Sequence, residues 1–376
     1  MQGGTVQIVR EQVLGYRVAA QGLDRSGRSV GALPVLDLGI QDSGAEAARL
    51  AFDARLPKKP PADGIGPGRP LALAWSLRGA PHVHRRRDLD ALAGALFPLS
   101  EADARGRLNE TGPSVQRAGI PALEQYAIAV AAMREVVTAA TAKGAASTAV
   151  TKRIPKVMWR DCRACRAEHI SDSAMRTATL AAGLELQPDT SPPVLAPRPG
   201  ARPAQDVDVP ALQRLIIAYL ALLGPATVAE AAGYLEARRA DIERVWPEGL
   251  VEVSVAGRAA WLPEQRLAEL KRAPQPELVR LLGPFDPYLQ ARDRDLIVPD
   301  RSVHKALWPV LGRPGVLFVD GEVVGTWRTR ASGSKLTVAV AAFAPLPPPV
   351  WRQVEAEAER VAAVRGAADV SVTRSE

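Results

Sequence analysis

The chain has 376 residues, of which 47% are hydrophobic and 24% charged, so its composition excludes wholesale disorder and fibrous architectures. Its 48 basic and 41 acidic residues give a formal net charge of +7. Two cysteines exclude a disulfide framework, and Arg10 and Glu11 interrupt the stretch where a signal peptide would be apolar. No apolar run approaches the roughly 18 residues of a membrane span, so we expect a cytoplasmic protein without membrane contact.

In chain order, the first segment (residues 1–98) is predicted to form two helices followed by a hairpin. The expected elements are helices over Val6–Ala20 and Gly44–Arg55, then strands over Leu71–Leu77 and Pro81–His84. The middle segment repeats this order with helices over Pro121–Ala140, Ser147–Arg153 and Ser171–Ala182 and short strands at Leu184–Leu186 and Val194–Ala196. Residues 155–169 are an insertion that splits this second unit.

The third segment gives the clearest signal. It predicts helices over Pro210–Leu223, Thr227–Glu236 and Ala240–Trp246, followed by strands over Gly249–Val255 and Ala259–Leu262. Thr227 and Glu230 have the spacing of a capping box, and Ala256-Gly257-Arg258 is typical of a hairpin turn. Three helices followed by a two-stranded hairpin is the order of a winged helix, and three copies of this unit are the simplest interpretation of residues 1–272.

The last hundred residues change to strands. We expect them at Leu296–Val298, Gly315–Val319, Glu322–Trp327 and Lys335–Ala342, with a final helix over Val350–Val364. The predicted fold class is therefore α+β, with three tandem winged-helix units and a small C-terminal β-barrel or sheet. The predicted domains are residues 1–98, 99–203 (with the CxxC insertion), 204–272 and 273–376.

Basic side chains gather at similar places in the three predicted units. They are Arg85, Arg86 and Arg87 in the first, Lys152, Arg153 and Lys156 in the second, and Arg238, Arg239 and Arg244 in the third. Winged helices bind duplex DNA with the third helix in the major groove and the wing on phosphates, so this recurrence favours binding to double-stranded DNA. The alternatives are ordinary solvated faces and a module that binds only proteins.

Motifs for metal and nucleotide chemistry are weak. Cys162 and Cys165 form a CxxC pair with His169 four residues on, but a structural zinc site uses four ligands and no second pair of cysteines exists. We therefore expect two reduced thiols or a decayed ribbon rather than a bound metal. His82 and His84 are expected on opposite sides of one strand, where they would not share a metal. No phosphate-binding or hydrolase motif is present, so no cofactor is expected.

Several segments resemble the AlkZ/YcaQ-like winged-helix DNA glycosylases. They are LDLGIQDSGAEAARLAFDAR (Leu36–Arg55), WSLRGAPHVHRRRDL (Trp75–Leu89), LLGPFDPYLQARDR (Leu281–Arg294) and DGEVVGTW (Asp320–Trp327). The resemblance covers essentially the whole chain. It implies three tandem winged helices and a C-terminal β-barrel in a C-shaped basic channel around duplex DNA, and excision of bulky or crosslinking alkylated purines.

The resemblance also implies a catalytic pattern of Gln, an apolar residue, then Gln or Asp before an Ala-Ala pair. Aligned on Ala47-Ala48, the first position is Gln41 and the second is Ser43, with Asp42 in the apolar slot. Ser43 is shorter than the expected side chain and is no base near neutrality. Asp42 could stabilise positive charge at the lesion, or Asp42 and Ser43 could simply cap the following helix.

Two further segments carry implied DNA contacts. Arg78 and His82 match an Arg-Gly-Thr-x-His wing in which Ala80 replaces Thr, and Arg328 and Arg330 lie on a basic hairpin that fits a minor-groove or backbone contact in the relatives. The leading hypothesis is a monomeric, monofunctional DNA glycosylase of the cytoplasm and nucleoid in which Gln41 positions water. The alternatives are a DNA-binding regulator or lesion sensor without activity, and a protein-interaction scaffold.

Overall fold

The computed structural model describes residues 6–44, 46–60, 64–108 and 119–374. It divides into two compact units, each of which draws on separate stretches of the chain. Unit 1 comprises Met1–Ala62, Ile217–Glu230 and Glu248–Glu376, and unit 2 comprises Asp63–Ile216 and Ala231–Pro247. Within the described residues, every helix is too short or too polar to cross a membrane.

Unit 1 begins with a strand rather than a helix. Strand β1 (Val6–Ile8) pairs in parallel with β10 (Leu250–Val255), which forms an antiparallel hairpin with β11 (Arg258–Pro263). The expected helix over Val6–Ala20 is therefore wrong at its start, and α1 covers Arg10–Ala20. The reason lies in the distant partner, since Ile8 packs in one core with Val253 and Val255.

The helices and hairpin of the third predicted segment occur in the expected order. They are α9 (Val209–Leu223), α10 (Val228–Leu235), α11 (Arg239–Arg244), β10 and β11, followed by α12 (Leu267–Lys271). The capping box is confirmed, because the N–H of Glu230 donates to Thr227 Oγ1 at 3.2 Å and the N–H of Thr227 donates to Glu230 Oε2 at 2.7 Å. At the hairpin turn, Ala256 and Gly257 both have positive φ, as a two-residue turn requires.

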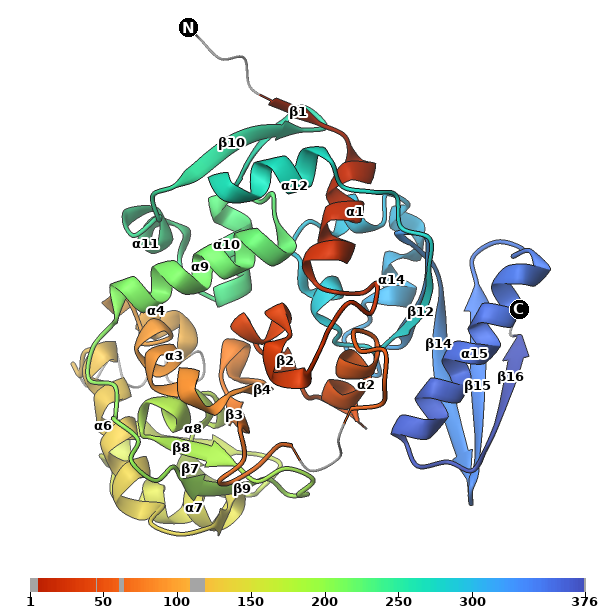
Figure 1. Cartoon of the computed structure of the whole chain (residues 1–376). Helices are drawn as coiled ribbons and strands as arrows, with labels where there is room; N and C mark the ends of the chain where they lie inside the picture. Colours follow the sequence, from red (N-terminus) through yellow and green to blue (C-terminus); the bar gives the residue numbers. More distant parts are fainter. Residues whose placement is uncertain (1–5, 45, 61–63, 109–118, 375–376) are drawn as a thin grey trace, which may run out of the picture. The chain divides into compact units, whose positions relative to one another are not determined.

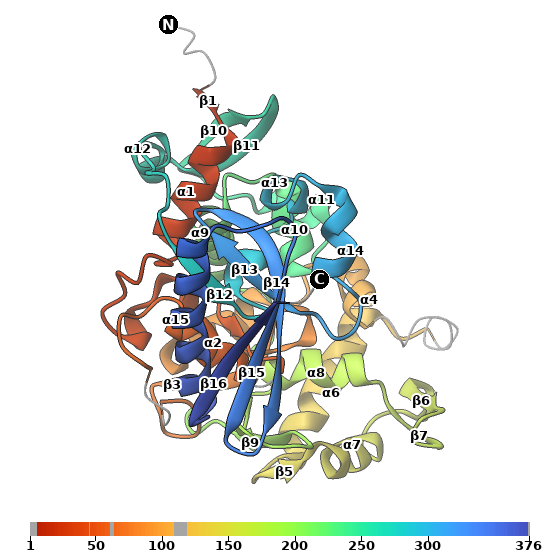
Figure 2. The ribbon, with the colours of Figure 1, turned by 90° about the vertical axis from the view of Figure 1, so that its right-hand side faces the viewer.

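The C-terminal part of unit 1 is an open five-stranded sheet (Figure 2). Its order is β12 (Val279–Leu282), β13 (Gly315–Val319), β14 (Glu322–Ser332), β15 (Lys335–Ala342) and β16 (Asp369–Arg374). Strands β12 and β16 are its edges, so among the described residues the sheet of the prediction holds and the closed barrel does not. The expected strand at Leu296–Val298 is wrong, because α13 (Arg294–Ile297) occupies that segment and is followed by α14 (His304–Leu307).

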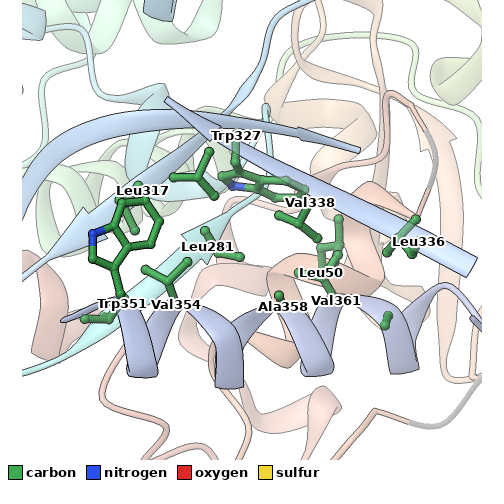
Figure 3. Close-up of a cluster of buried hydrophobic side chains, with 13 residues drawn as sticks. Leu50, Leu281, Leu317, Trp327, Leu336, Val338, Trp351, Val354, Ala358 and Val361 are labelled. Carbon is green, nitrogen blue, oxygen red and sulfur yellow. The ribbon is translucent and has the colours of Figure 1, made fainter. Parts of the chain in front are cut away.

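Helix α15 (Pro348–Val364) lies along this sheet and buries one face on it. Trp351, Val354, Ala358 and Val361 recur at the three- and four-residue spacing of one helical face and point at the sheet (Figure 3). Leu50, from helix α2 (Ala47–Asp53), enters the same core, so the short helix near the start of the chain is fixed to the C-terminal sheet.

Unit 2 contains an antiparallel sheet whose strands follow the order β4 (Pro81–Arg85), β3 (Leu71–Trp75), β8 (Leu184–Leu186), β9 (Val194–Pro197) and β5 (Thr141–Ala142). Helix α8 (Asp172–Ala181) packs against β3 and β8 (Figure 1). The other helices are α3 (Leu89–Ala95), α4 (Glu101–Arg107), α6 (Ala122–Val136) and α7 (Lys143–Thr151). The predicted strands at 71–77, 81–84, 184–186 and 194–196 are thus confirmed to within a few residues.

The insertion in the second predicted unit folds into a small hairpin. Strand β6 (Trp159–Cys162) pairs with β7 (Ala167–Ile170) in a separate two-stranded sheet, set apart from the other strands of unit 2 (Figure 2). The sequence analysis assigned no structure here, because charged residues interrupt the segment at short intervals and leave no regular apolar pattern.

Candidate active site and DNA-contacting residues

Helix α2, which follows the candidate catalytic motif, is held by a buried ion pair at its end. Arg55 Nη1 and Nη2 each donate to an oxygen of Asp286 at 2.8 Å, and both side chains are 0% exposed. Arg55 also donates to Ala51 O and Gln21 Oε1, and Asp286 Oδ1 accepts the N–H of Tyr288. Two parallel bonds fix direction as well as distance, so the pair orients the end of α2.

A second ion pair ties the same helix to α15. Arg360 Nε donates to Asp53 Oδ2 at 2.9 Å and Nη2 to Oδ1 at 2.8 Å. Burial raises the pKa of Asp53, and the guanidinium of Arg360 works against that rise. Both ion pairs anchor α2. Asp53 and Arg55 come from the quoted segment Leu36–Arg55, and Asp286 comes from the quoted segment Leu281–Arg294. Sequence analysis assigned Arg55 and Asp286 no role, although a charged residue within an apolar segment is the available signal.

Gln41 is the last residue of the short strand β2 (Ile40–Gln41), and the other two candidate catalytic residues, Asp42 and Ser43, lie between β2 and α2. The Gln41 amide donates from Nε2 to Ser43 Oγ at 3.0 Å, so these two side chains face each other. Asp42 Oδ1 accepts the backbone N–H of Ala48 at 3.0 Å. The carboxylate thus binds an N–H of the first turn of α2, which is the capping role, and the negative charge lies where the helix dipole favours it.

This loop turns tightly, so α2 starts later than expected. Gly44 has a φ of 105° and Glu46 a φ of 59°, both in the left-handed region, and Glu46 forms an ion pair with Arg49. A left-handed residue breaks an α-helix. The predicted helix over Gly44–Arg55 is therefore too long at both ends, and α2 covers Ala47–Asp53.

The Arg78–Ala80 turn of unit 2 is also strained. Arg78 has a φ of 58°, donates from Nη1 to Tyr234 O at 3.1 Å, and stacks its guanidinium 5.1 Å from the centre of the Tyr234 ring. Gly79 follows with a φ of 59°. These contacts hold the turn at the end of the β3–β4 hairpin.

The two histidines of β4 are neutral and buried. Burial holds the pKa of His82 well below its usual value, and the nearby Arg78 and His84 lower it further. Burial and the charge of Arg85 lower the pKa of His84 to about 3. His82 Nδ1–H donates to Ala80 O at 2.9 Å, and the two rings lie 5.9 Å apart. The expectation that they face opposite sides is wrong, because residues two apart on a strand share a face.

Arg85, the last residue of β4, and Arg86, which follows it, each pair with an acidic side chain of unit 2. Arg86 pairs with the fully buried carboxylate of Glu185 at 2.8 Å and donates to Arg69 O and Gly66 O. Arg85 lies 3.5 Å from an oxygen of Asp88. Arg86 therefore stabilises the sheet of unit 2, and its guanidinium is less available for phosphate than the sequence suggested.

The remaining candidate DNA-contacting residues are exposed. Arg153 lies 3.3 Å from Glu135, Arg239 lies 2.7 Å from Glu243, and Arg328 donates to Gly312 O at 2.7 Å. The other three, all of them with exposed side chains, are Lys152, Arg238 and Arg330. The two exposed ion pairs, of Arg153 and Arg239, are weak enough to exchange for phosphate contacts.

The β6–β7 hairpin brings Cys162, Cys165 and His169 together. One ligand atom from each lies within 4.8 Å of the other two. The backbone N–H of Cys165 and the nearby His169 ring lower the pKa of the Cys162 thiol to about 7, while Cys162 raises the pKa of Cys165. Thiolate and imidazole donors at these distances could hold a metal ion.

Comparison with known proteins shows which class of protein has this fold. The solved structure of Streptomyces sahachiroi DNA glycosylase AlkZ matches with a TM-score of 0.75 and 20% identity, over 98% of this chain and 100% of that chain. The family model for AlkZ-like DNA glycosylases matches residues 35–364, so the chain belongs to the AlkZ-like DNA glycosylase family. A search of curated proteins finds no match.

Proposed function

We propose that this protein is a monofunctional DNA glycosylase that hydrolyses the N-glycosidic bond of bulky or crosslinking alkylated purines in duplex DNA. The observation that carries the proposal is the bond from the Gln41 amide to Ser43 Oγ, which brings the two side chains together just before α2. In this arrangement the Gln41 carbonyl and the Ser43 hydroxyl are the groups that orient the attacking water.

Cleavage of this bond needs little acid catalysis from the protein. A purine alkylated at N7 or N3 is cationic and already a good leaving group, so the enzyme mainly positions water at C1′ and stabilises a transition state with oxocarbenium character. An amide can accept one hydrogen bond from that water and donate another. The segment Leu36–Arg55 contains no Lys, which supports attack by water rather than through a Schiff base.

The rival function is a DNA-binding protein without activity, either a regulator or a lesion sensor. It is favoured by one specific observation, the bond from Ala48 N–H to Asp42, which commits that carboxylate to the helix. Ser43 alone then occupies the second position, and a hydroxyl is a poor base near neutrality.

We also propose the DNA-holding surfaces. Three winged-helix domains, at residues 1–98, 99–203 and 204–272, would hold the duplex. The protein would act as a monomer and would need no nucleotide cofactor. The exposed side chains of Lys152, Arg238 and Arg330 supply phosphate contacts, and removal of one should weaken binding across sequences and lower the slope of log affinity against log salt by about 1.

The test is release of free base from duplex DNA that carries N7-alkylguanine adducts of increasing size. We expect wild-type protein to release the base and Gln41→Ala to lose most of the rate, while Gln353→Ala, an exposed Gln on α15, keeps it. Tight binding without release from any adduct would favour the rival function. Release that is unchanged in Gln41→Ala would contradict the assignment of the water-positioning residue.

A further inference from the structure

The β6–β7 hairpin has the geometry of a metal site. Cys162 pairs with Ala167 and Arg160 pairs with His169, so Cys162 and His169 lie on the same face of the hairpin, displaced by one diagonal step. Cys165 lies in the turn between the strands, where Arg166 takes a φ of 51°. The tight turn brings the second thiol back toward the first.

The orientation of the His169 ring independently favours a metal site. Its Nδ1 lies 2.6 Å from the carbonyl oxygen of Ile170, to which the ring donates. This places the lone pair of the neutral imidazole on Nε2. Nε2 is shielded from solvent and has no hydrogen-bond partner among the described residues. Metal-bound histidines usually have this arrangement, with one ring nitrogen fixed by a carbonyl and the other on the ion.

We propose that Cys162 Sγ, Cys165 Sγ and His169 Nε2 bind a Zn²⁺ ion. Two thiolates and an imidazole are a donor set that Zn²⁺ prefers. Tetrahedral zinc with Zn–S bonds of about 2.3 Å needs sulfurs about 3.8 Å apart. The ligand atoms already lie within 4.8 Å of one another, so side-chain rotation in a short turn closes the remaining distance.

Three protein ligands leave one coordination position open. Among the described residues, no fourth His, Cys or carboxylate joins the group. Asp172 is the acidic residue beside it, but Lys143 and Arg176 already hold its carboxylate. The three ligands line a cavity of about 690 Å³, so the open position is taken by water or a small anion that enters from the cavity.

A bound ion would also stabilise the folded hairpin. Each strand has four residues, and a two-stranded hairpin of this size is marginal in water by itself. Binding energy from a metal is folding energy for the segment that it holds. The count of cysteines argued against a four-ligand structural site, and this three-ligand geometry is compatible with that count.

The experiment uses the full chain. We expect about one zinc per chain after purification from zinc-containing medium, and intense visible bands from thiolate–cobalt bonds when stripped protein is titrated with Co²⁺. Cys162→Ser and His169→Gln should each weaken Co²⁺ binding by more than about 100-fold, since loss of a ligand exceeds the cost of an outer-shell change. Arg163→Ala, in the same turn, should bind as the wild type does.

A second measurement needs no variant. Arg163 and Arg166 are exposed in the turn, so trypsin should cut there faster in stripped protein than after zinc is restored. Substoichiometric zinc without cobalt bands, or metal binding that survives Cys162→Ser, would overturn the proposal.

Discussion

The buried Arg55–Asp286 pair allows a quantitative test of how helix α2 is anchored. Asp286→Ala would leave a guanidinium that is 0% exposed without its two carboxylate bonds at 2.8 Å. Breaking a buried pair from one side costs about 3–5 kcal/mol, because the remaining charge stays desolvated. Arg55 Nε already has no partner among the described residues, so the site has no spare acceptor to offer.

The matched control is the exposed pair Arg301–Asp295, whose side chains are 77% and 57% exposed. Asp295→Ala should leave the free energy of unfolding nearly unchanged, because solvent screens an exposed pair. Urea unfolding followed by circular dichroism gives both free energies, with equal m-values required for the comparison. Asp286→Asn, which keeps an acceptor oxygen but loses the charge, should fall between the two. If Asp286→Ala lies within 1 kcal/mol of Asp295→Ala, the pair does not anchor α2 as argued.

Three further predictions concern the loop and β4. Asp42→Ala should lower the free energy of unfolding by about 1 kcal/mol through loss of the bond to Ala48, whereas Asp42→Asn should cost a few tenths; equal losses would exclude capping. Ser43→Asp should raise the rate of base release at pH 7 by about tenfold, less than the usual general-base effect because the leaving group is cationic; no rise would show that the second position does not act on water. His84 is 2% exposed and has a pKa lowered to about 3. Between pH 6.5 and 3 the unfolded chain therefore binds more protons than the folded chain, and the free energy of unfolding falls as pH drops. From pH 8 to pH 5 the stability advantage of wild type over His84→Gln should shrink by about 2 kcal/mol in urea titrations, and a constant difference would contradict the neutral, buried state.

The local elements followed from the sequence wherever the signal was itself local. The capping box at Thr227 and Glu230, the hairpin turn at Ala256-Gly257 and the apolar face of α15 depend on residues a few positions apart. Such patterns determine helix starts, turns and buried faces before any long-range contact forms. The candidate catalytic motif at Gln41–Ser43 also came from the sequence, through its likeness to a family, and its role stays a prediction.

Tertiary structure determined what those residues do. Strand β1 exists because β10 pairs with it, for example Val6 with Val253, and the C-terminal sheet stays open because β16 becomes its edge. Asp42 caps α2 through its bond to Ala48, and Arg86 pairs with Glu185, because each charge binds the partner that folding brings within reach. Hydrogen bonds and ion pairs depend on distances of about 3 Å, and sequence spacing does not set those distances between residues far apart along the chain.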